Sequence, residues 1–218
     1  MDEALRVREF WFGKAWTGAL PPPADREGLP RANSLAQRAS VWFETDPRLL
    51  EQHDEWIRSE FNGLVERAAR GELAGWADSP RRRLSLIILL DQFPRHIHRG
   101  RPQAFAWDEQ ALSLALSGMQ SAADAALNVV ERIFFYMPLQ HAESQDVQEE
   151  SVAAYRRLVA ECPADLRTLF EESLESARSH RELIKQFGRF PHRNRVLGRA
   201  STAAEEIWLR ANPDRFGQ

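Results

Sequence analysis

The sequence predicts an all-α fold, a single domain of about eight or nine helices that form either a bundle or an irregular array of helical hairpins. Apolar residues recur at three-to-four spacing over long stretches, and the alternation typical of β-strands is nearly absent. Proline and glycine stand where helices would begin and end. The length of 218 residues suits one domain with a substantial core, so the predicted domain spans residues 1–218.

The individual helices follow from these signals in chain order. An apolar stripe between Pro47 and Arg70 predicts the first long helix, and a second stripe predicts another over residues 163–187. Prolines at a typical first helical position are Pro47, Pro80, Pro102 and Pro163. Predicted helix ends are marked by Gly71, Gly100, Gly118 and Gly188. The spacing of a capping box is found at Ser121 with Asp124 and at Thr202 with Glu205.

Two further helices are apolar on most of their faces, which predicts that they are buried. They are "RRLSLIILLDQF" at 82–93 and "AALNVVERIFFYMPL" at 125–139. The Pro-rich stretch 18–31, which contains "LPPPADREGLP", is predicted to be an extended surface loop.

Composition narrows the class of partner. The formal net charge is -3, which argues against nucleic-acid or anionic-membrane binding by the whole surface, so a basic site has to be a local patch. Cys162 is the only cysteine, which excludes an internal disulfide and a cysteine-based metal cluster. The longest apolar run, residues 84–90, is too short to cross a membrane, and the first residues do not resemble a signal peptide. A cytoplasmic location is the resulting expectation.

Two similar segments, "LLDQFPRHIHRGR" at 89–101 and "FGRFPHRNRVLGR" at 187–199, bring arginine and histidine next to a Phe-Pro bend. The two buried helices carry the acids Asp91 and Glu131, which need cationic partners if they are ionised in the core. We therefore hypothesise that the Phe-Pro segments converge on these acids and supply guanidinium partners from Arg95, Arg99, Arg189 and Arg193. The alternative is that such a network only fixes how the helices pack.

Histidines near these charges suggest two kinds of site. A divalent metal site is one possibility, with the candidate ligands Asp91, Glu131, His141, Glu143 and His180, although no HExxH spacing is found. An anion site is the other, with the candidate ligands Arg95, His96, Arg99, Arg189, His192, Arg193 and Asn194. For catalysis, Glu131 and His141 are the candidate acid or base. A solvated basic surface is the alternative to the anion site.

Three long motifs resemble one known family. "LLDQFPRHIHRG", "ERIFFYMPLQHAES" and "FGRFPHRNRVLGRASTAAEEIWL", with an early "FWFG", are similar to the bacterial domain-of-unknown-function family 924 (DUF924) over residues 7–209. The resemblance implies a tetratricopeptide-like array of helical pairs and implies no activity, substrate or partner. Beyond the candidates above, its motifs contain Gln92, Phe93, Pro94, Arg132, Pro138, Gly188, Phe190 and Pro191.

The leading functional prediction is binding of an anionic small molecule or an acidic peptide in an Arg/His-lined pocket. A metal-assisted hydrolase is the alternative, and a purely structural ion-pair network is the third interpretation, in which Asp91, Gln92, Arg132, Glu143 and His180 only hold the helices together. The sequence does not decide whether the chain is an enzyme and does not predict an oligomeric state. No cofactor is expected other than a divalent metal in the hydrolase alternative.

Overall fold

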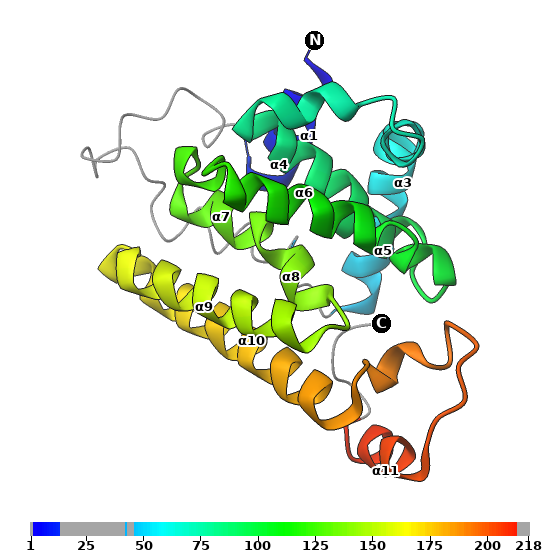
Figure 1. Ribbon diagram of the computed structural model, residues 1–218. Helices are drawn as coiled ribbons and strands as arrows, with labels where there is room; N and C mark the ends of the chain where they lie inside the picture. Colours follow the sequence, from blue (N-terminus) through cyan, green and yellow to red (C-terminus); the bar gives the residue numbers. More distant parts are fainter. Residues whose placement is uncertain (1, 14–41, 43–45, 213–218) are drawn as a thin grey trace.

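The computed structural model describes residues 2–13, 42 and 46–212 (Figure 1). Within this part of the chain the regular elements are helical and none is a strand, which confirms the all-α prediction. The elements in chain order are α1 (Glu3–Phe12), α3 (Pro47–Ala69), η3 (Ala74–Asp78), α4 (Pro80–Ile87), η4 (Ile88–Gln92), α5 (Phe93–Ile97), η5 (Pro102–Phe105), α6 (Asp108–Gln120), η6 (Asp124–Ala126), α7 (Val129–Phe135), α8 (Met137–His141), α9 (Gln145–Glu161), η7 (Ala164–Leu166), α10 (Arg167–Phe187), η8 (Pro191–Arg193) and α11 (Ala203–Ala211).

Local signals predicted several helix ends correctly. Helix α3 begins at Pro47, where the Asp46 side chain accepts hydrogen bonds from the first backbone N–H groups. Helix α10 ends at Gly188, whose φ of 70° is the left-handed conformation that glycine adopts without steric cost. At α11 the predicted capping box of Thr202 and Glu205 is present.

Two predicted signals inside the chain were wrong. Helix α6 runs past Gly118 to Gln120, because this glycine lies against the Phe135 ring and its missing side chain is needed for packing. Ser121 closes α6 and does not cap η6. A capping box is instead formed by Asn128 and Glu131 at the start of α7.

Between α4 and α5 the helix widens into the π-helical turn η4. Pro94 has no N–H, and in a regular α-helix its ring would collide with the carbonyl group of Leu90. The turn avoids this arrangement, because the Phe93 N–H bonds to the carbonyl of Ile88, five residues earlier. Asp91 lies within the widened turn and is completely buried.

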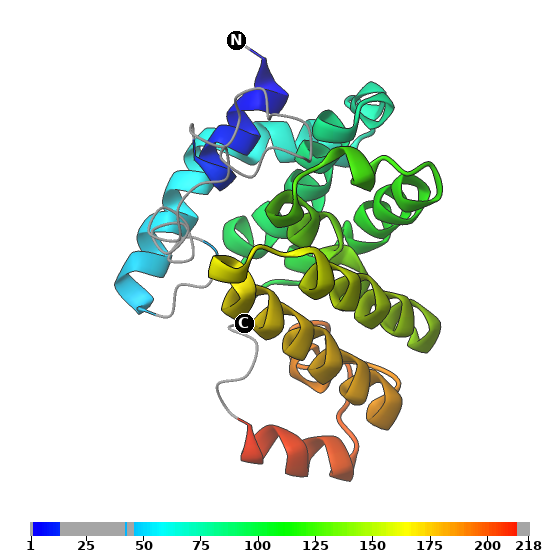
Figure 2. The same ribbon diagram turned by 90° about the vertical axis from the view of Figure 1, so that its left-hand side faces the viewer.

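Helices α9 and α10 lie side by side as a long antiparallel pair (Figures 1 and 2), and α11 packs through Trp208 against the end of α10. This pair is a helical hairpin of the predicted kind. The helices from α4 to α8 are shorter, and the finer prediction of a tetratricopeptide-like array stays a prediction. The predicted loop at 18–31 lies outside the described residues.

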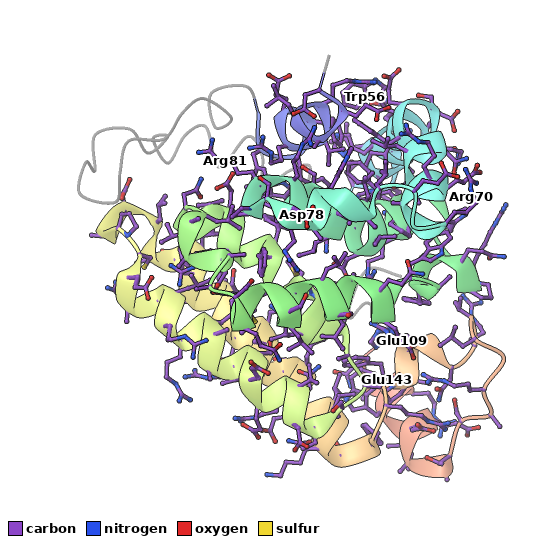
Figure 3. The ribbon with its side chains drawn as sticks, turned by 45° about the horizontal axis from the view of Figure 1, so that its top comes forward. Trp56, Arg70, Asp78, Arg81, Glu109 and Glu143 are labelled. Atoms are coloured by element: carbon purple, nitrogen blue, oxygen red, sulfur yellow. The ribbon has the colours of Figure 1, made fainter. Side chains whose placement is uncertain are left out.

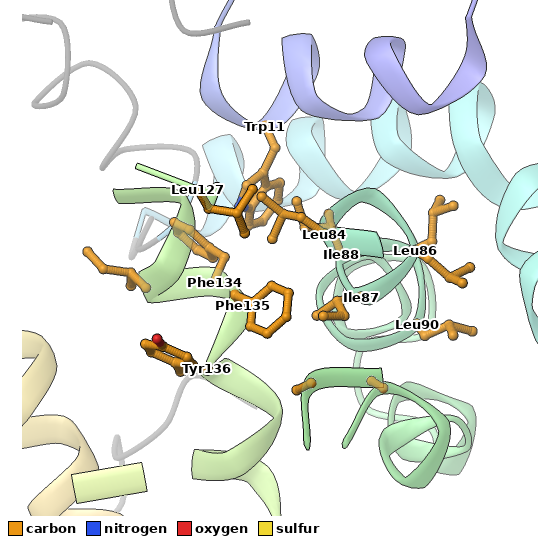
Figure 4. Packing of buried hydrophobic residues seen from close by; sticks show 14 of the residues in the cluster. Trp11, Leu84, Leu86, Ile87, Ile88, Leu90, Leu127, Phe134, Phe135 and Tyr136 are labelled. Atoms are coloured by element: carbon orange, nitrogen blue, oxygen red, sulfur yellow. The ribbon is translucent and has the colours of Figure 1, made fainter. Parts of the chain in front are cut away.

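The main hydrophobic core includes α1, α4 and α7 and continues through α3, η4, α8, α9 and the first half of α10. Figure 4 shows Trp11 of α1 above Leu84 of α4 and beside Phe134 and Phe135 of α7. These four side chains are almost completely buried. A smaller core is formed by Leu183, Ile184 and Phe190, with Phe187 and Trp208 packed against it. Among the described helices, none is long and apolar enough to cross a membrane.

Candidate functional site

The two Phe-Pro segments meet at Asp108, the first residue of α6. Arg95 on α5 donates a hydrogen bond to Asp108 Oδ2 at 3.0 Å, and Arg193 on η8 donates to the same oxygen at 3.2 Å. Figure 1 shows the segment after α10 returning toward the ends of α5 and α6. The predicted convergence therefore occurs, but Asp108 is the acid that joins the segments.

Asp91 is the second acid of this site, and it links Arg95 to His141. Its Oδ1 atom lies 2.6 Å from His141 Nδ1 and 3.4 Å from an Arg95 nitrogen, and Gln92 donates to its other oxygen. Burial opposes ionisation of Asp91, but the charges and hydrogen bonds of its neighbours outweigh burial and hold its pKa at about 2. Asp91 is therefore a carboxylate at neutral pH.

His141 ends α8 and keeps 14% of its side-chain surface exposed. Burial and the nearby positive charge of Arg95 lower the pKa of His141. Because an ionised carboxylate can only accept hydrogen bonds, the neutral imidazole carries its proton on Nδ1 and a lone pair on Nε2. His180 on α10 packs edge-on against His141, with ring centroids 6.3 Å apart, and its Nδ1–H donates to the Ser176 carbonyl at 2.8 Å. Burial lowers the pKa of His180 to about 3.

Arg193 is held between two aromatic rings. Its guanidinium carbon lies 4.6 Å from the Phe105 ring centroid and 4.7 Å from that of Phe190. Burial lowers the pKa of Arg193 to about 10, so the side chain remains charged at neutral pH. Three buried polar atoms of this site have no hydrogen-bond partner: Arg95 Nε, Arg193 Nε and Asp108 Oδ1. Such atoms are uncommon in folded proteins, because each gives up its bonds to water without replacement.

Glu143 fixes the second Phe-Pro segment. It accepts two hydrogen bonds from Arg199, at 2.7 and 2.9 Å, and one from the backbone N–H of Phe190 at 2.8 Å. Figure 3 shows Glu143 where the chain after α8 meets this segment. Asn194 is nearly buried and binds Ser201 and Arg199. These two predicted residues shape the loop that carries Arg193.

Comparison with known proteins identifies the family. A model described as "Bacterial protein of unknown function (DUF924)" matches residues 7–213. The chain belongs to the DUF924 family. It is also similar to the solved structure of a protein of unknown function from Agrobacterium tumefaciens, with 31% sequence identity, a TM-score of 0.68, and coverage of 82% of this chain and 99% of the other. The search of curated proteins gave no match. These findings confirm the resemblance of the three motifs.

In this DUF924 chain, three of the predicted anion ligands lie away from Asp108. His96 and Arg99 both bind Asp54, His96 through Nδ1 at 2.8 Å and Arg99 through two hydrogen bonds at 2.6 and 2.9 Å. Arg189 binds Glu205 through two hydrogen bonds at 2.7 and 2.8 Å, beside a surface cavity of about 590 Å³.

Three predicted partnerships were therefore wrong. Of the four candidate arginines, only Arg95 contacts Asp91, because Arg99, Arg189 and Arg193 each have another acid within hydrogen-bond distance. His192 packs against Phe190, with ring centroids 5.4 Å apart, so it borders the site.

Glu131 and Arg132 belong to other parts of this DUF924 fold. Glu131 is buried, as predicted, but it caps α7, and its nearest cation is Arg8 at 4.0 Å. Burial raises the pKa of Glu131. Arg132 binds Glu161 on α9 at 2.6 Å.

The five candidate metal ligands are consequently divided between separate contacts. Asp91 binds His141, His180 binds a backbone carbonyl, Glu131 caps α7 and Glu143 binds Arg199. Within residues 2–13, 42 and 46–212, no group of three or more His, Cys, Asp or Glu side chains could hold a metal ion.

Sequence reasoning missed Asp108, which is central to the site, and Asp54, Arg199 and Glu205, which hold its surroundings. The signal at Asp108 was weak, because an acid in the first turn of a helix is commonplace and is explained by the helix dipole alone. Glu205 was recognised only as a helix cap, although it also binds Arg189.

Proposed function

We propose that the chain binds a small oxyanion, a phosphate or a carboxylate, between Arg95 and Arg193. The observation that carries this proposal is the pair of buried Nε atoms, one on each arginine, that have no hydrogen-bond partner. Two guanidinium groups drawn together by one carboxylate oxygen offer spare N–H donors in a site with little water. Arginine suits such a site because its planar N–H groups match the geometry of phosphate and carboxylate.

The second oxygen of Asp108 restricts the ligand further. Asp108 Oδ1 is buried and has no hydrogen-bond donor, so a ligand that satisfies the whole site has to bring a donor as well as acceptors. Hydrogen phosphate and carboxylates with a neighbouring hydroxyl group meet this requirement. Sulfate, which carries no proton at neutral pH, does not.

Burial favours a small ligand over an acidic peptide. The side chains of Arg95 and Arg193 are only 11% and 7% exposed, so a peptide carboxylate could reach them only if its backbone entered the site. The metal-assisted hydrolase has less support, because Glu131 and Glu143 are bound elsewhere.

The test compares phosphate, sulfate and malonate with chloride at constant ionic strength, using thermal unfolding and calorimetric titration. We expect phosphate to raise the unfolding temperature and to bind about tenfold more tightly than sulfate, since one additional charge-assisted hydrogen bond corresponds to about that factor. Equal, small effects of all the anions would contradict the proposal and leave the cluster as a structural network.

Arginine variants locate the binding site. Arg193→Lys keeps the charge but removes the Nε–H, and we expect it to weaken phosphate binding about tenfold. Arg189→Lys is the matched control, because Arg189 lies in the same segment but its Nε already binds Glu205 at 2.7 Å. If both variants weakened phosphate binding equally, the site would lie elsewhere.

A further inference from the structure

His141 and the two arginines belong to one connected network of ion pairs. Asp91 Oδ1 contacts both the His141 imidazole and the Arg95 guanidinium, and Asp108 Oδ2 contacts both Arg95 and Arg193. The four ion pairs form an unbroken chain from His141 to Arg193. Arg95 and His141 contact the same oxygen of Asp91, at 3.4 and 2.6 Å, so the Arg95 guanidinium, which holds the proposed oxyanion, lies close to the His141 ring.

The proton of His141 is fixed by its surroundings. Asp91 accepts the Nδ1–H, which leaves the Nε2 lone pair facing away from the carboxylate. Nε2 has no hydrogen bond to any described residue, and the ring is partly open to solvent. A buried carboxylate that orients a histidine and stabilises its charged form is the arrangement by which enzymes prepare a histidine to accept a proton.

We propose that His141, oriented by Asp91, accepts a proton through Nε2 from the oxyanion held by Arg95 and Arg193, so that the chain is an acid–base enzyme. This inference rests on the proposed function. The substrate class is a small carboxylate or phosphate compound with a hydroxyl group beside its charged group. The O–H bond of the substrate breaks, its electron pair stays on the oxygen, and the proton forms the second N–H bond of an imidazolium.

Charge in the site supports this direction of transfer. Asp91 remains ionised and pairs with the imidazolium, which needs no other reactant. The charged and titratable groups around His141 are Asp91 on η4, Arg95 on α5, Asp108 on α6, His180 on α10, and His192 and Arg193 on η8. Two arginines balance the two aspartates, and moving the proton from the ligand to His141 leaves the net charge of the site and its ligand unchanged.

The first test is the protonation state of His141 in the intact wild-type chain. Two-bond ¹H–¹⁵N spectra report which ring nitrogen carries the proton, and a His141→Gln variant assigns its signals among the six histidines. We expect the Nδ1–H form at neutral pH. The Nε2–H form would overturn the proposal, because Nε2 could then not accept a proton.

The second test is modification by diethyl pyrocarbonate, followed by mass spectrometry at pH 7. The Nε2 lone pair attacks a carbonyl carbon of the reagent, and ethyl carbonate leaves and decays to ethanol and carbon dioxide. We expect His141 to react, saturating phosphate to slow its reaction about fivefold, and Asp91→Asn to slow it about tenfold. His96 is the internal control for slowing by phosphate. It is also bound to an aspartate, Asp54, but it lies outside this chain of contacts, so phosphate should not change its rate of modification.

The two proposals can fail separately. If phosphate stabilises the protein but His141 is unreactive or unprotected, the anion site stands and the role of His141 is refuted. If His141 reacts in the Nδ1–H form and phosphate neither binds nor protects it, the anion site is refuted. Because Asp91→Asn could unfold the chain, the wild-type spectrum and the phosphate protection each test His141 without that variant.

Discussion

Asp91→Asn should make the stability of the protein less sensitive to acid. The carboxyl group has a pKa of about 2 in the folded chain against 3.8 in the unfolded one. Because the folded-state pKa is the lower one, the contribution is fully present above about pH 4 and is lost as the pH falls through 2. A shift of this size corresponds to about 2 kcal/mol, roughly half of which is lost by pH 3. The substitution also removes one of the two carboxylates that pair with the buried Arg95 guanidinium, and breaking a buried ion pair costs up to about 3–5 kcal/mol at neutral pH.

Urea unfolding monitored by circular dichroism measures this contribution. The free energies of unfolding of wild type and Asp91→Asn are compared between pH 6 and pH 3, where their difference should narrow by about 1 kcal/mol. Asp78→Asn is the control, because Asp78 is exposed, and its difference from wild type should stay constant. A difference for Asp91→Asn that is independent of pH would refute the assignment of Asp91 as a stabilising buried carboxylate.

Two other predictions concern packing and histidine. Gly118→Ala should destabilise the protein by about 1–3 kcal/mol in urea unfolding, because the new methyl group would lie 2.5 Å from Phe135 and 2.9 Å from Arg83. Gly63→Ala is the matched control: its methyl group would meet open space, so the variant should stabilise α3 by about 0.5–1 kcal/mol. His180→Gln should make the unfolding temperature depend less on pH between about pH 6.5 and pH 4. His180 has a pKa of about 3 in the folded protein, so the unfolded chain binds its proton first and the folded protein loses stability as the pH falls. Parallel curves of unfolding temperature against pH for the variant and wild type would contradict this prediction.

Local features of the fold were predictable from the sequence because their causes lie within a few residues. The proline at the start of α3, the glycine at the end of α10 and the Thr202–Glu205 box each act on the nearest turn of helix. The wrong prediction of a helix end at Gly118 arose because its cause lies far away in the sequence. What fixes that glycine is Phe135 on another helix, and a sequence pattern does not reveal which ring will lie against it.

The site was predictable in its residue types and much less in its pairs. The motifs singled out Asp91, Arg95, His141, His180 and Arg193, which the structure does bring together. Which acid each arginine pairs with depends on which carboxylates the fold places beside it. Arg95 and Arg193 both pair with Asp108, which lies at the start of a helix and has no distinguishing sequence pattern. Glu131 was correctly expected to be buried, but Asn128 three residues earlier already offered it a capping role.

The two similar Phe-Pro segments have different roles in the structure. In the first, Pro94 follows a π-helical turn that places Asp91 and Arg95 on the same side of the chain. In the second, Glu143 binds the backbone at Phe190 and leaves Arg193 to reach Asp108. A network that served only to hold helices together would need no more than these ion pairs. The two unpaired Nε atoms and the unpaired Asp108 oxygen go beyond that need, and they belong to the three residues that join the two segments. For this reason we place the function of the chain at this junction, and not at the Asp54 or Glu205 ion pairs, in which the acids are fully engaged by their arginines.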